Sequence, residues 1–592
     1  MDSYSRIRTT LSRSYRISIF DKIEGLFHSF SIAEKTIFTI GFVLIVYATL
    51  SLLAKINDTF LIQVPAYGGT LSEGVIGTPR FINPILAVSD ADRDLSSLVY
   101  SGLMKATPSG EFVPDLAERY SVSSDGLTYT FILRSDAVFH NGTPVTADDV
   151  EFTVTKAQDS MLKSPKRLNW EGVKVEKSGE REIKFILKQP YSPFIANTTL
   201  GILPRHIWKT FESDQFPFSQ YNVNPIGSGP YRVESLTRSK DGIPTAYFLR
   251  AFKDYSLGRP YIEKINLSFF ANEKTLVEAL EEDVIESASN ITAHTAVDLS
   301  SKNIHLLRAP LTRVFGLFFN QNQKEVLAHR EIRFALDEIL DKQSIIDTVL
   351  DGSGTIASSA LPPTVAEKIR GVGDDDAMAT STRDTILARL KKAGWTSNAT
   401  SSLTLSPKGK TKSVLDIALT TSNVPELVET ANIVAESWRT LGANVEVKVF
   451  EPSDLNQSVI RPRRYDVLLF GLVVGRDPDL YAFWHSSQRN DPGLNIAMYT
   501  NAKADKALED MRKATSTDAA KISYERFSKE VSTDMPAIFL FSPDFVYAIP
   551  ERIHNITLGQ ITTPNDRFLS IHDWYIETDN IWKFLNDNVS RK

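Results

Sequence analysis

The clearest alternation of apolar and polar side chains lies between residues 127 and 134. One face of this stretch carries Leu127, Tyr129, Phe131 and Leu133. This period of two predicts a half-buried strand. Asn141-Gly142 then predicts a tight reversal, because both residues accept positive φ. Thr146, followed three residues later by Asp149, predicts a capped helix that begins at Ala147.

A second set of patterns begins near residue 313. Residues 314–320 form an apolar run of the buried type. Residues 331–350 place Ile332, Leu336 and Leu340 on one face, which predicts a single helix that ends before Gly352.

The next patterns alternate between strand and helix. Residues 415–421 predict a strand, residues 426–441 a helix, and residues 445–449 another strand, which together form a βαβ unit with parallel pairing. Residues 465–474 are almost continuously apolar, as expected for a strand covered on both faces. Ligands of such sheets bind beyond the carboxyl ends of the strands, which points to residues 471–484.

Residues 36–54 carry no charged side chain. At about 1.5 Å per residue, a helix of this length nearly crosses a hydrocarbon core of roughly 30 Å. Residues 1–35 carry six basic side chains against four acidic ones, and no small-residue cleavage pattern follows the apolar stretch. We therefore expect a basic cytoplasmic tail, an uncleaved transmembrane signal anchor over 36–54, and a linker over 55–66.

The bulk composition restricts the class of protein. A chain of 592 residues is too long for one core, so two or three domains are expected. The net charge of −6 and the lack of a basic, aromatic-interleaved stripe argue against nucleic acid as a partner. The absence of cysteine excludes disulfides, zinc ribbons and thiol catalysis.

No catalytic or cofactor motif stands out in the sequence. It lacks HExxH, G-x-S-x-G and a Gly-rich dinucleotide fingerprint, and Gly409-Lys410-Thr411 has Thr404 where a phosphate-binding loop needs its first glycine. The nine histidines show no metal-ligand spacing. Residues 374–376 are three aspartates without the glycine and glutamate of a calcium loop, so an acidic surface loop is the preferred interpretation. No metal or cofactor is predicted.

The string from Tyr129 to Thr153, YTFILRSDAVFHNGTPVTADDVEFT, resembles the signature segment of the extracytoplasmic solute-binding proteins of family 5, the peptide and nickel type. Residues 110–120 and the NPIGSGPYRV segment at 224–233 resemble further motifs of that family, in its order. The resemblance covers about residues 68–580. It implies an α/β, periplasmic-binding-protein-like fold of type II, large peptide-binding subtype, with two lobes of mixed sheets and a ligand cleft between them.

The resemblance also implies the domain limits and the location. We expect lobe I over 67–312, lobe II over 313–533, and a C-terminal return to lobe I over 534–592. With the anchor, this places the protein in the cell membrane as a single-pass chain, its body on the extracytoplasmic side.

Within the resemblance, residues 470–488 bear most directly on the ligand. Peptide-binding members of the family commonly have Trp after the strand-end glycine and, four positions beyond that glycine, an Asp that grips the peptide's α-ammonium. Here Leu472 follows Gly471, and Gly475 stands where that Asp would be. Asp477 either takes that role from a shifted loop or caps the helix expected over 480–484. A buried ammonium without a charge partner is costly, so the ligand's charge is an open question.

The predicted ligand-binding residues lie near matching strand ends in the two lobes. They are Glu73, Asn83, Tyr100, Asn320, Phe470, Gly471, Leu472, Asp477, Tyr481 and Trp484. Tyr100 and Trp484 suit flat walls with a polar tip, and they suit core positions equally well.

The family resemblance implies a monomeric, membrane-anchored receptor that captures peptides or a related solute by closing its two lobes. An ABC permease in the membrane would be its partner, and no enzymatic activity is expected. A ligand sensor or chaperone-like receptor on the same fold is an alternative. A membrane-anchored hydrolase is another, with His485 as the only obvious general base.

Overall fold

A computed structural model describes most of the chain, and it divides into two compact units. One comprises the N-terminal segment through Ala66 together with the C-terminal segment from Thr578, and the other comprises Tyr67–Glu577. The described residues are 29–301, 304–370, 382–397, 403–405, 413–476, 479–514 and 516–583.

The first unit is built on α3 (Ile32–Phe60), a helix long and apolar enough to cross a membrane, with no buried residue. Ser31 and Glu34 form a capping box at its start, in which the Ser31 N–H donates to the Glu34 carboxylate at 2.8 Å. The segment expected as a linker, 55–66, has regular structure. No glycine or proline interrupts 55–60, so the helix continues to Phe60, and β1 (Leu61–Ala66) then pairs with β23 (Glu577–Trp582).

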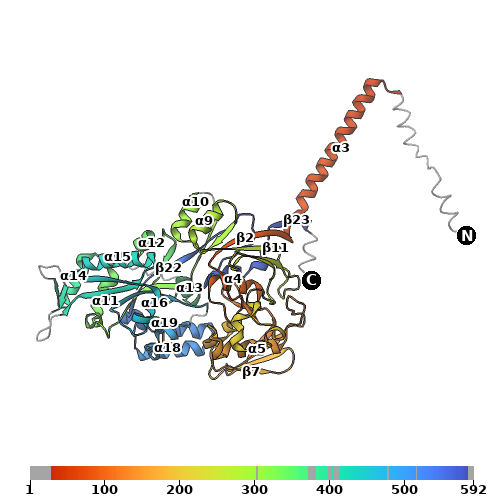
Figure 1. Cartoon of the computed structure of the whole chain (residues 1–592). Helices are drawn as coiled ribbons and strands as arrows, with labels where there is room; N and C mark the ends of the chain where they lie inside the picture. Colours follow the sequence, from red (N-terminus) through yellow and green to blue (C-terminus); the bar gives the residue numbers. More distant parts are fainter. Residues whose placement is uncertain are drawn as a thin grey trace. The chain divides into compact units, whose positions relative to one another are not determined.

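In Tyr67–Glu577 the twelve-residue strand β22 (Ala537–Ala548) joins two groups of strands into one sheet (Figure 1). The order across the sheet is β20 (Asn444–Phe450), β19 (Asp416–Ser422), β21 (Val467–Val473), β14 (Arg313–Phe319), β22, β12 (Ser287–Ser289), β2 (Gly68–Ile76), β11 (Ile262–Phe270), β10 (Pro244–Ala251) and β9 (Tyr231–Arg238). The strands β13 (Leu306–Pro310) and β15 (Gly354–Ile356) also pair with β22.

The apolar cores divide this unit into two lobes. One large core takes buried side chains from Leu71 to Leu311 and again from Phe545 to Trp574. Two other cores draw theirs from residues between Val314 and Phe541. We call the part on either side of that interval the first lobe and residues 314–541 the second lobe. The chain therefore crosses between lobes twice, beside β13 and β14 and within β22.

The second lobe buries its sheet on both faces. Along β14, Leu317 and Phe319 enter one core and Val314 and Phe318 the other, which explains the unbroken apolar run. Helices α12 and α15 lie on one side of this sheet and α18 and α19 on the other (Figure 1). The second-lobe helices are α11 (Arg330–Glu338), α12 (Lys342–Val349), α13 (Pro363–Arg370), α14 (Arg383–Lys392), α15 (Pro425–Thr440), α18 (Ala502–Lys513) and α19 (Thr517–Asp534).

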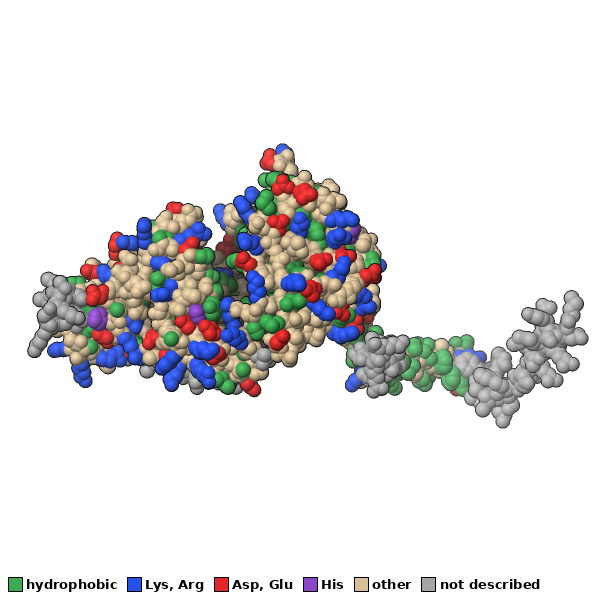
Figure 2. Space-filling model, turned by 90° about the horizontal axis from the view of Figure 1, so that it is seen from below, with side chains coloured by type: hydrophobic (Ala, Val, Ile, Leu, Met, Phe, Trp, Pro, Cys, Tyr) green, Lys and Arg blue, Asp and Glu red, His purple; other side chains and the backbone are tan. Residues whose placement is uncertain are grey.

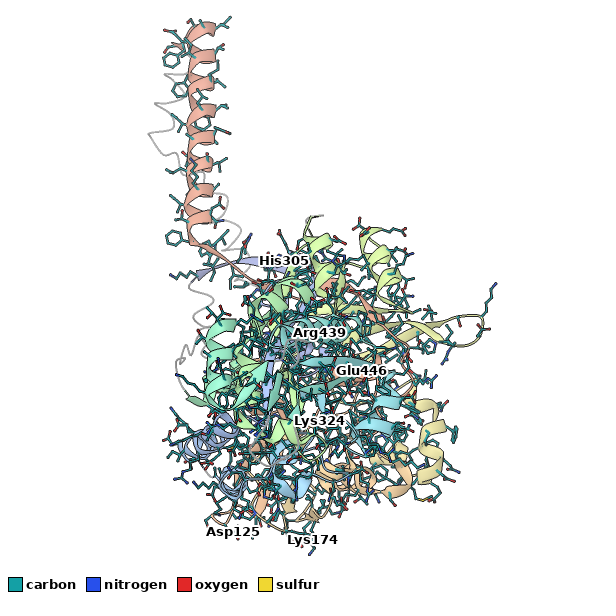
Figure 3. All side chains as sticks on the ribbon, turned by 90° about the vertical axis from the view of Figure 1, so that its left-hand side faces the viewer. Asp125, Lys174, His305, Lys324, Arg439 and Glu446 are labelled. Carbon is teal, nitrogen blue, oxygen red and sulfur yellow. The ribbon has the colours of Figure 1, made fainter. Side chains whose placement is uncertain are left out.

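The predicted βαβ unit is confirmed, because β19 and β20 pair in parallel around α15. Figure 3 marks its carboxyl-terminal half with Arg439 and Glu446. The single helix predicted over 331–350 is wrong. It is two helices, α11 and α12, because the Asp341 side chain accepts the Ser344 N–H at 3.0 Å and caps a new helix start.

In the first lobe, the strand predicted from the alternating pattern is confirmed as β6 (Thr128–Leu133). It lies in a four-stranded sheet, and Figure 3 marks one end of its strands with Asp125, in the turn between β5 and β6, and Lys174, the first residue of β7. The order of that sheet is β5 (Ala117–Val122), β6, β8 (Glu182–Ile186) and β7 (Lys174–Lys177). The first-lobe helices are α4 (Asp90–Val99), α5 (Ala147–Gln158), α9 (Glu273–Glu281) and α10 (Ala293–Ser301).

The predicted turn and helix cap after β6 are also confirmed. Gly142 has φ +80° in the turn, and the Phe139 N–H donates to the Thr143 carbonyl at 2.8 Å. At the start of α5, the Thr146 N–H donates to the Asp149 carboxylate at 2.8 Å. These residues hold local structure.

Candidate functional site

A cavity of about 440 Å³ opens at the boundary of the two lobes. The first lobe supplies most of the wall, from the end of α4 and from residues 562–569, and the second lobe contributes Arg476. Figure 2 shows a hollow between two bulky halves of the body, with Lys and Arg side chains near its edges. The volume falls within the range of roughly 300–1,000 Å³ usual for small-ligand pockets.

Tyr100, directly after α4, lies on this wall and is only 5% exposed. Its hydroxyl is buried and finds no hydrogen-bond partner among the described residues. Burial raises the pKa of this phenol, so the group keeps its proton. Ser96, one turn earlier, also lines the cavity, and within the described part of the chain its buried hydroxyl has no partner. Such groups are ready to bond a polar ligand or water.

The Gly-Ser-Gly motif at 227–229 fixes the end of α4 and therefore the position of Tyr100. The Gly229 N–H donates to the Val99 carbonyl at 2.8 Å. A Cβ on Gly227 would lie 2.0 Å from the same carbonyl oxygen, so no larger residue fits there. The motif is therefore structural rather than phosphate-binding.

Arg476 reaches across the lobe boundary to Asp566. Its Nη2 lies 2.5 Å from Asp566 Oδ2, and the two side chains are 14% and 6% exposed. The same carboxylate oxygen accepts the Thr562 N–H at 2.7 Å and the Thr563 N–H at 3.1 Å, so it is already well satisfied. The Arg476 Nε and Nη2 atoms are buried and make no well-directed hydrogen bond to any described residue. Arg476 is therefore held beside the cavity mainly by its charge contact with Asp566.

Two further cations stand on the wall near this pair. Lys166 is exposed, and its pKa is lowered by the surrounding protein and by the charge of Arg93, while Asp566 raises it in part. Arg93 is half-exposed and lies 3.3 Å from Asp90. Arg93 and Asp566 thus both act electrostatically on Lys166.

Lys105 and Asp115 form a second charged group on the wall. The Lys105 ammonium donates to the Tyr255 hydroxyl at 2.9 Å. Burial lowers the pKa of Lys105 and raises that of Asp115, and each charge partly offsets the shift of the other. Asp115 also accepts a hydrogen bond from Ser256. This group is internally paired.

Of the ten residues predicted from sequence, Tyr100 alone lies among the described residues that line this cavity. Glu73 is fully buried in the first lobe, where its carboxylate accepts a hydrogen bond from Arg567 Nε at 2.7 Å and another from the Tyr547 hydroxyl at 2.7 Å. Asn83 is also buried; its side chain accepts the Ile85 N–H at 3.1 Å and donates to Asn222 at 3.2 Å.

The second-lobe predictions lie in several places. The Asn320 amide donates to the Arg463 carbonyl at 2.9 Å, and Trp484 packs in a core against Phe539. Phe470, Gly471 and Leu472 belong to β21. A Cβ on Gly471 would lie 2.7 Å from the Phe315 ring.

Tyr481 begins α17 (Tyr481–Trp484) and lies against Arg512, whose guanidinium carbon is 3.9 Å from the ring centroid. Asp477 lies outside the described residues, as do the aspartates at 374–376. Four charged residues of the cavity wall are not among those predicted from sequence, namely Arg476, Asp566, Lys166 and Arg93. The sequence does contain a signal for Arg476. This residue directly follows Gly475, which stands where peptide-binding members of the family have the Asp that binds the ammonium.

His485, the base of the hydrolase alternative, is not among the described residues of the cavity wall. It stacks on Tyr481 with ring centroids 4.1 Å apart, and its Nδ1 lies 2.8 Å from Ser487 Oγ. Within the described ranges, no group of three or more His, Asp or Glu side chains could hold a metal ion.

Comparison with solved structures shows which class of proteins shares this architecture. The structure of the oligopeptide-binding protein AppA from Bacillus subtilis in complex with a nonapeptide matches at a TM-score of 0.65 and 27% identity, over 87% of this chain and 100% of that one. The substrate-binding protein CtaP from Listeria monocytogenes matches at 0.71 and 25%, over 86% and 100%. The fold is that of the type II periplasmic peptide-binding proteins, α/β with two lobes and mixed sheets.

The sequence comparisons agree. A family model described as bacterial extracellular solute-binding proteins, family 5 Middle, matches residues 111–493. The oligopeptide-binding protein AppA of Bacillus subtilis (strain 168) is 28% identical over 520 residues, which is 86% of this chain and 92% of that protein. Protein XP55 of Streptomyces lividans is 27% identical over 494 residues, 82% and 85%. The chain belongs to family 5 of the bacterial extracellular solute-binding proteins.

Proposed function

We propose that this protein is the membrane-anchored, extracytoplasmic substrate-binding component of an ABC importer, and that it captures peptides between its two lobes. The observation that carries the proposal is the cavity at the lobe boundary, where Arg476 of the second lobe meets first-lobe groups that include the unpartnered Tyr100 and Ser96 hydroxyls. Family membership supports it, as does the likeness to an oligopeptide-binding protein whose structure holds a nonapeptide.

The two crossings between the lobes give the body a narrow hinge. The Leu311 N–H donates to the Pro543 carbonyl at 3.1 Å, and the Ser542 hydroxyl donates to the Leu311 carbonyl at 2.8 Å, so the crossings are bonded to each other. Small changes of φ and ψ at these few residues are sufficient to rotate one lobe against the other. A ligand that contacts both walls would favour the closed arrangement, and rotation would release it to the permease.

The other contacts between the lobes hold them together in the present arrangement. Within the second lobe, Asp479 receives three hydrogen bonds from Nε and Nη2 of Arg512, the shortest at 2.6 Å. From the first lobe, the Tyr191 hydroxyl donates to Asp479 at 3.2 Å, and the Ser192 N–H donates to the Arg512 carbonyl at 3.2 Å. We call these four residues the interlobe clasp.

The test of ligand class uses the full chain in lipid nanodiscs. Native mass spectrometry after incubation with a mixed peptide library is expected to show retained peptide, and the same peptides are expected to raise the unfolding temperature. If no peptide raises it while a non-peptide solute does, peptide capture is wrong.

The anchor is tested separately. With α3 uncleaved, the protein stays in the membrane fraction after an alkaline carbonate wash, and its N-terminal sequence begins at residue 1 or 2. A mature chain that begins after residue 54 would show that the helix is a removable signal.

A further inference from the structure

We infer that strand β23 gives the protein a second contact with the membrane, in which the Trp582 side chain lies in the headgroup layer on the extracytoplasmic side. The inference goes beyond ligand capture. It rests only on the part of the proposed function that makes α3 an uncleaved membrane anchor. The partner is the lipid of that headgroup layer rather than another protein.

The level of the membrane surface along α3 follows from the sequence. The uncharged stretch ends at Ala54, and Lys55 is the first charged side chain after it. A lysine at the end of a span places its ammonium among the lipid headgroups. Asn57 lies three residues beyond Ala54, about 4.5 Å further along a helix that rises about 1.5 Å per residue. The headgroup layer extends roughly 5–7 Å beyond the hydrocarbon on each side, so Asn57 lies within it.

Trp582 is bonded to the helix at this level. Its Nε1 donates to Asn57 Oδ1 at 2.9 Å, so the end of β23 lies beside the last turn of α3 (Figure 1). The residue is 46% exposed. Because Nε1 is the only polar atom of an indole, the exposed part of the ring is mainly carbon. Tryptophan is enriched at membrane surfaces because it combines a hydrogen-bonded N–H with a broad apolar ring.

Two further apolar side chains are exposed at the same end of α3. Ile56 is 45% exposed and Phe60 is 60% exposed. Phe60 follows Asn57 by three residues and Ile56 by four, so these side chains are neighbours on the helix surface. Exposed apolar groups gathered in this way mark a surface for a membrane or a partner. The span itself brings lipid to this surface, since the uncharged stretch of α3 ends less than one turn before Asn57.

The pair of strands β1 and β23 also needs support from outside. It forms a two-stranded sheet, and neither strand contains a buried residue. A sheet of two strands is at best marginally stable in water by itself. Contact of Trp582 with the lipid headgroups fixes the end of β23, and the pairing with β1 joins that contact to the anchor.

Tryptophan fluorescence of the full chain tests the inference. All seven tryptophans lie in the described ranges, and the six other than Trp582 are at most 1% exposed. A quencher carried by lipid therefore reaches Trp582 alone. The chain is reconstituted in phosphatidylcholine vesicles whose acyl chains are plain, brominated near the headgroup, or brominated near the bilayer centre.

The emission of Trp582 is the difference between the natural chain and Trp582→Phe, a change at an exposed position that keeps an aromatic ring. We expect this difference to fall about twofold or more with bromine near the headgroup, and distinctly less with bromine near the bilayer centre, because the indole lies at the membrane surface. The remaining emission of Trp582→Phe should be the same in all three lipids, which makes this variant the control for the six buried tryptophans.

Equal emission of Trp582 in plain and brominated lipid would overturn the inference. Iodide in the water would then show whether the ring lies in water or against protein. Stronger quenching by the deep bromine than by the shallow one would also contradict it, because the ring would then lie in the hydrocarbon. In both cases the chain still floats with the vesicles and the proposed function stands. A chain that does not float with them would contradict the membrane anchor itself, and the inference would fall with it.

Discussion

At the scale of single residues, His140 shows how an apparently reactive side chain serves the fold. Its Nδ1 accepts the Gly227 N–H at 3.3 Å, and its Nε2 lies 3.1 Å from the Gly229 carbonyl, which requires the neutral ring with its proton on Nε2. Burial lowers the pKa of His140 to about 4, although the Gly229 carbonyl partly opposes the shift. Both ring nitrogens of His140 thus bond to the glycine segment at 227–229, the same segment that positions Tyr100.

This environment predicts a loss of stability in mild acid. The unfolded chain protonates His140 near pH 6.5, whereas the folded chain resists protonation until about pH 4. Stability therefore falls as the pH drops through this window, by about 3 kcal/mol from this group. Urea unfolding at pH 7, 5.5 and 4 should show a shallower decline for His140→Gln than for the natural chain. His572, whose pKa is lowered in the same way, is unchanged in the variant and provides the residual slope.

At the scale of elements, one buried arginine ties together four separate parts of the first lobe. Arg567 donates to Asp94 of α4 at 2.6 Å and to Glu73 of β2 at 2.7 Å, and Tyr547 of β22 donates to the same glutamate. Arg567 and Glu73 are fully buried and Asp94 is 1% exposed. Two carboxylates on one guanidinium leave a net negative charge in the core, and burial raises the pKa of Asp94 to about 6, against the lowering effect of Arg567.

Removal of this arginine should be far more costly than removal of a surface one. Arg567→Met leaves two buried carboxylates without their cation and is expected to lower the free energy of unfolding by about 3–5 kcal/mol. Arg552→Met is the control, because its ion pair with Glu286 is 45% exposed at the arginine and should be worth at most about 1 kcal/mol. Chemical denaturation of both variants measures the difference, and equal small losses would contradict a structural role for Arg567.

At the scale of the whole molecule, the interlobe clasp influences binding without touching the cavity. None of its four residues is among the described lining residues. The clasp can form only when the lobes are as close as they are in this structure, so it stabilises this arrangement selectively. Its effect should therefore appear in ligand affinity more than in the stability of either lobe.

Tyr191→Phe tests this directly, because it removes the hydroxyl that bonds Asp479 and keeps the ring beside Arg512. A lost hydrogen bond to a carboxylate is worth about 1.5–3 kcal/mol, so ligand dissociation should be about 10-fold faster or more. Stopped-flow release of a retained peptide measures this rate. The 40% exposed Tyr120, changed to Phe, is the control. Faster release from both variants, or from neither, would argue against the clasp.

Short-range patterns were sufficient for most elements and for the family. The β6 strand, the Asn141-Gly142 turn and the Thr146 cap were all predicted, because each depends on neighbours within a few residues. The parallel β19–β20 pair followed from its alternating strand, helix and strand. The wrong helix prediction, missed at the break at Asp341, concerns where a helix ends, and so does the unpredicted continuation of α3 past residue 54. At such positions a single capping hydrogen bond, or the absence of a helix-breaking residue, decides whether the helix ends or continues.

The site itself depended on contacts between distant parts of the chain. Arg476 and Asp566 are 90 positions apart and meet only because β22 and the β13–β14 crossing bring the lobes together. Glu73 and Asn83 have polar side chains of the kind that bind ligands, but tertiary packing buries both inside the first lobe. The sequence therefore determined the elements, the family and the missing acidic residue at Gly475. Folding determined which charges face the cavity, because electrostatic neighbours are set by distance in space rather than by separation along the chain.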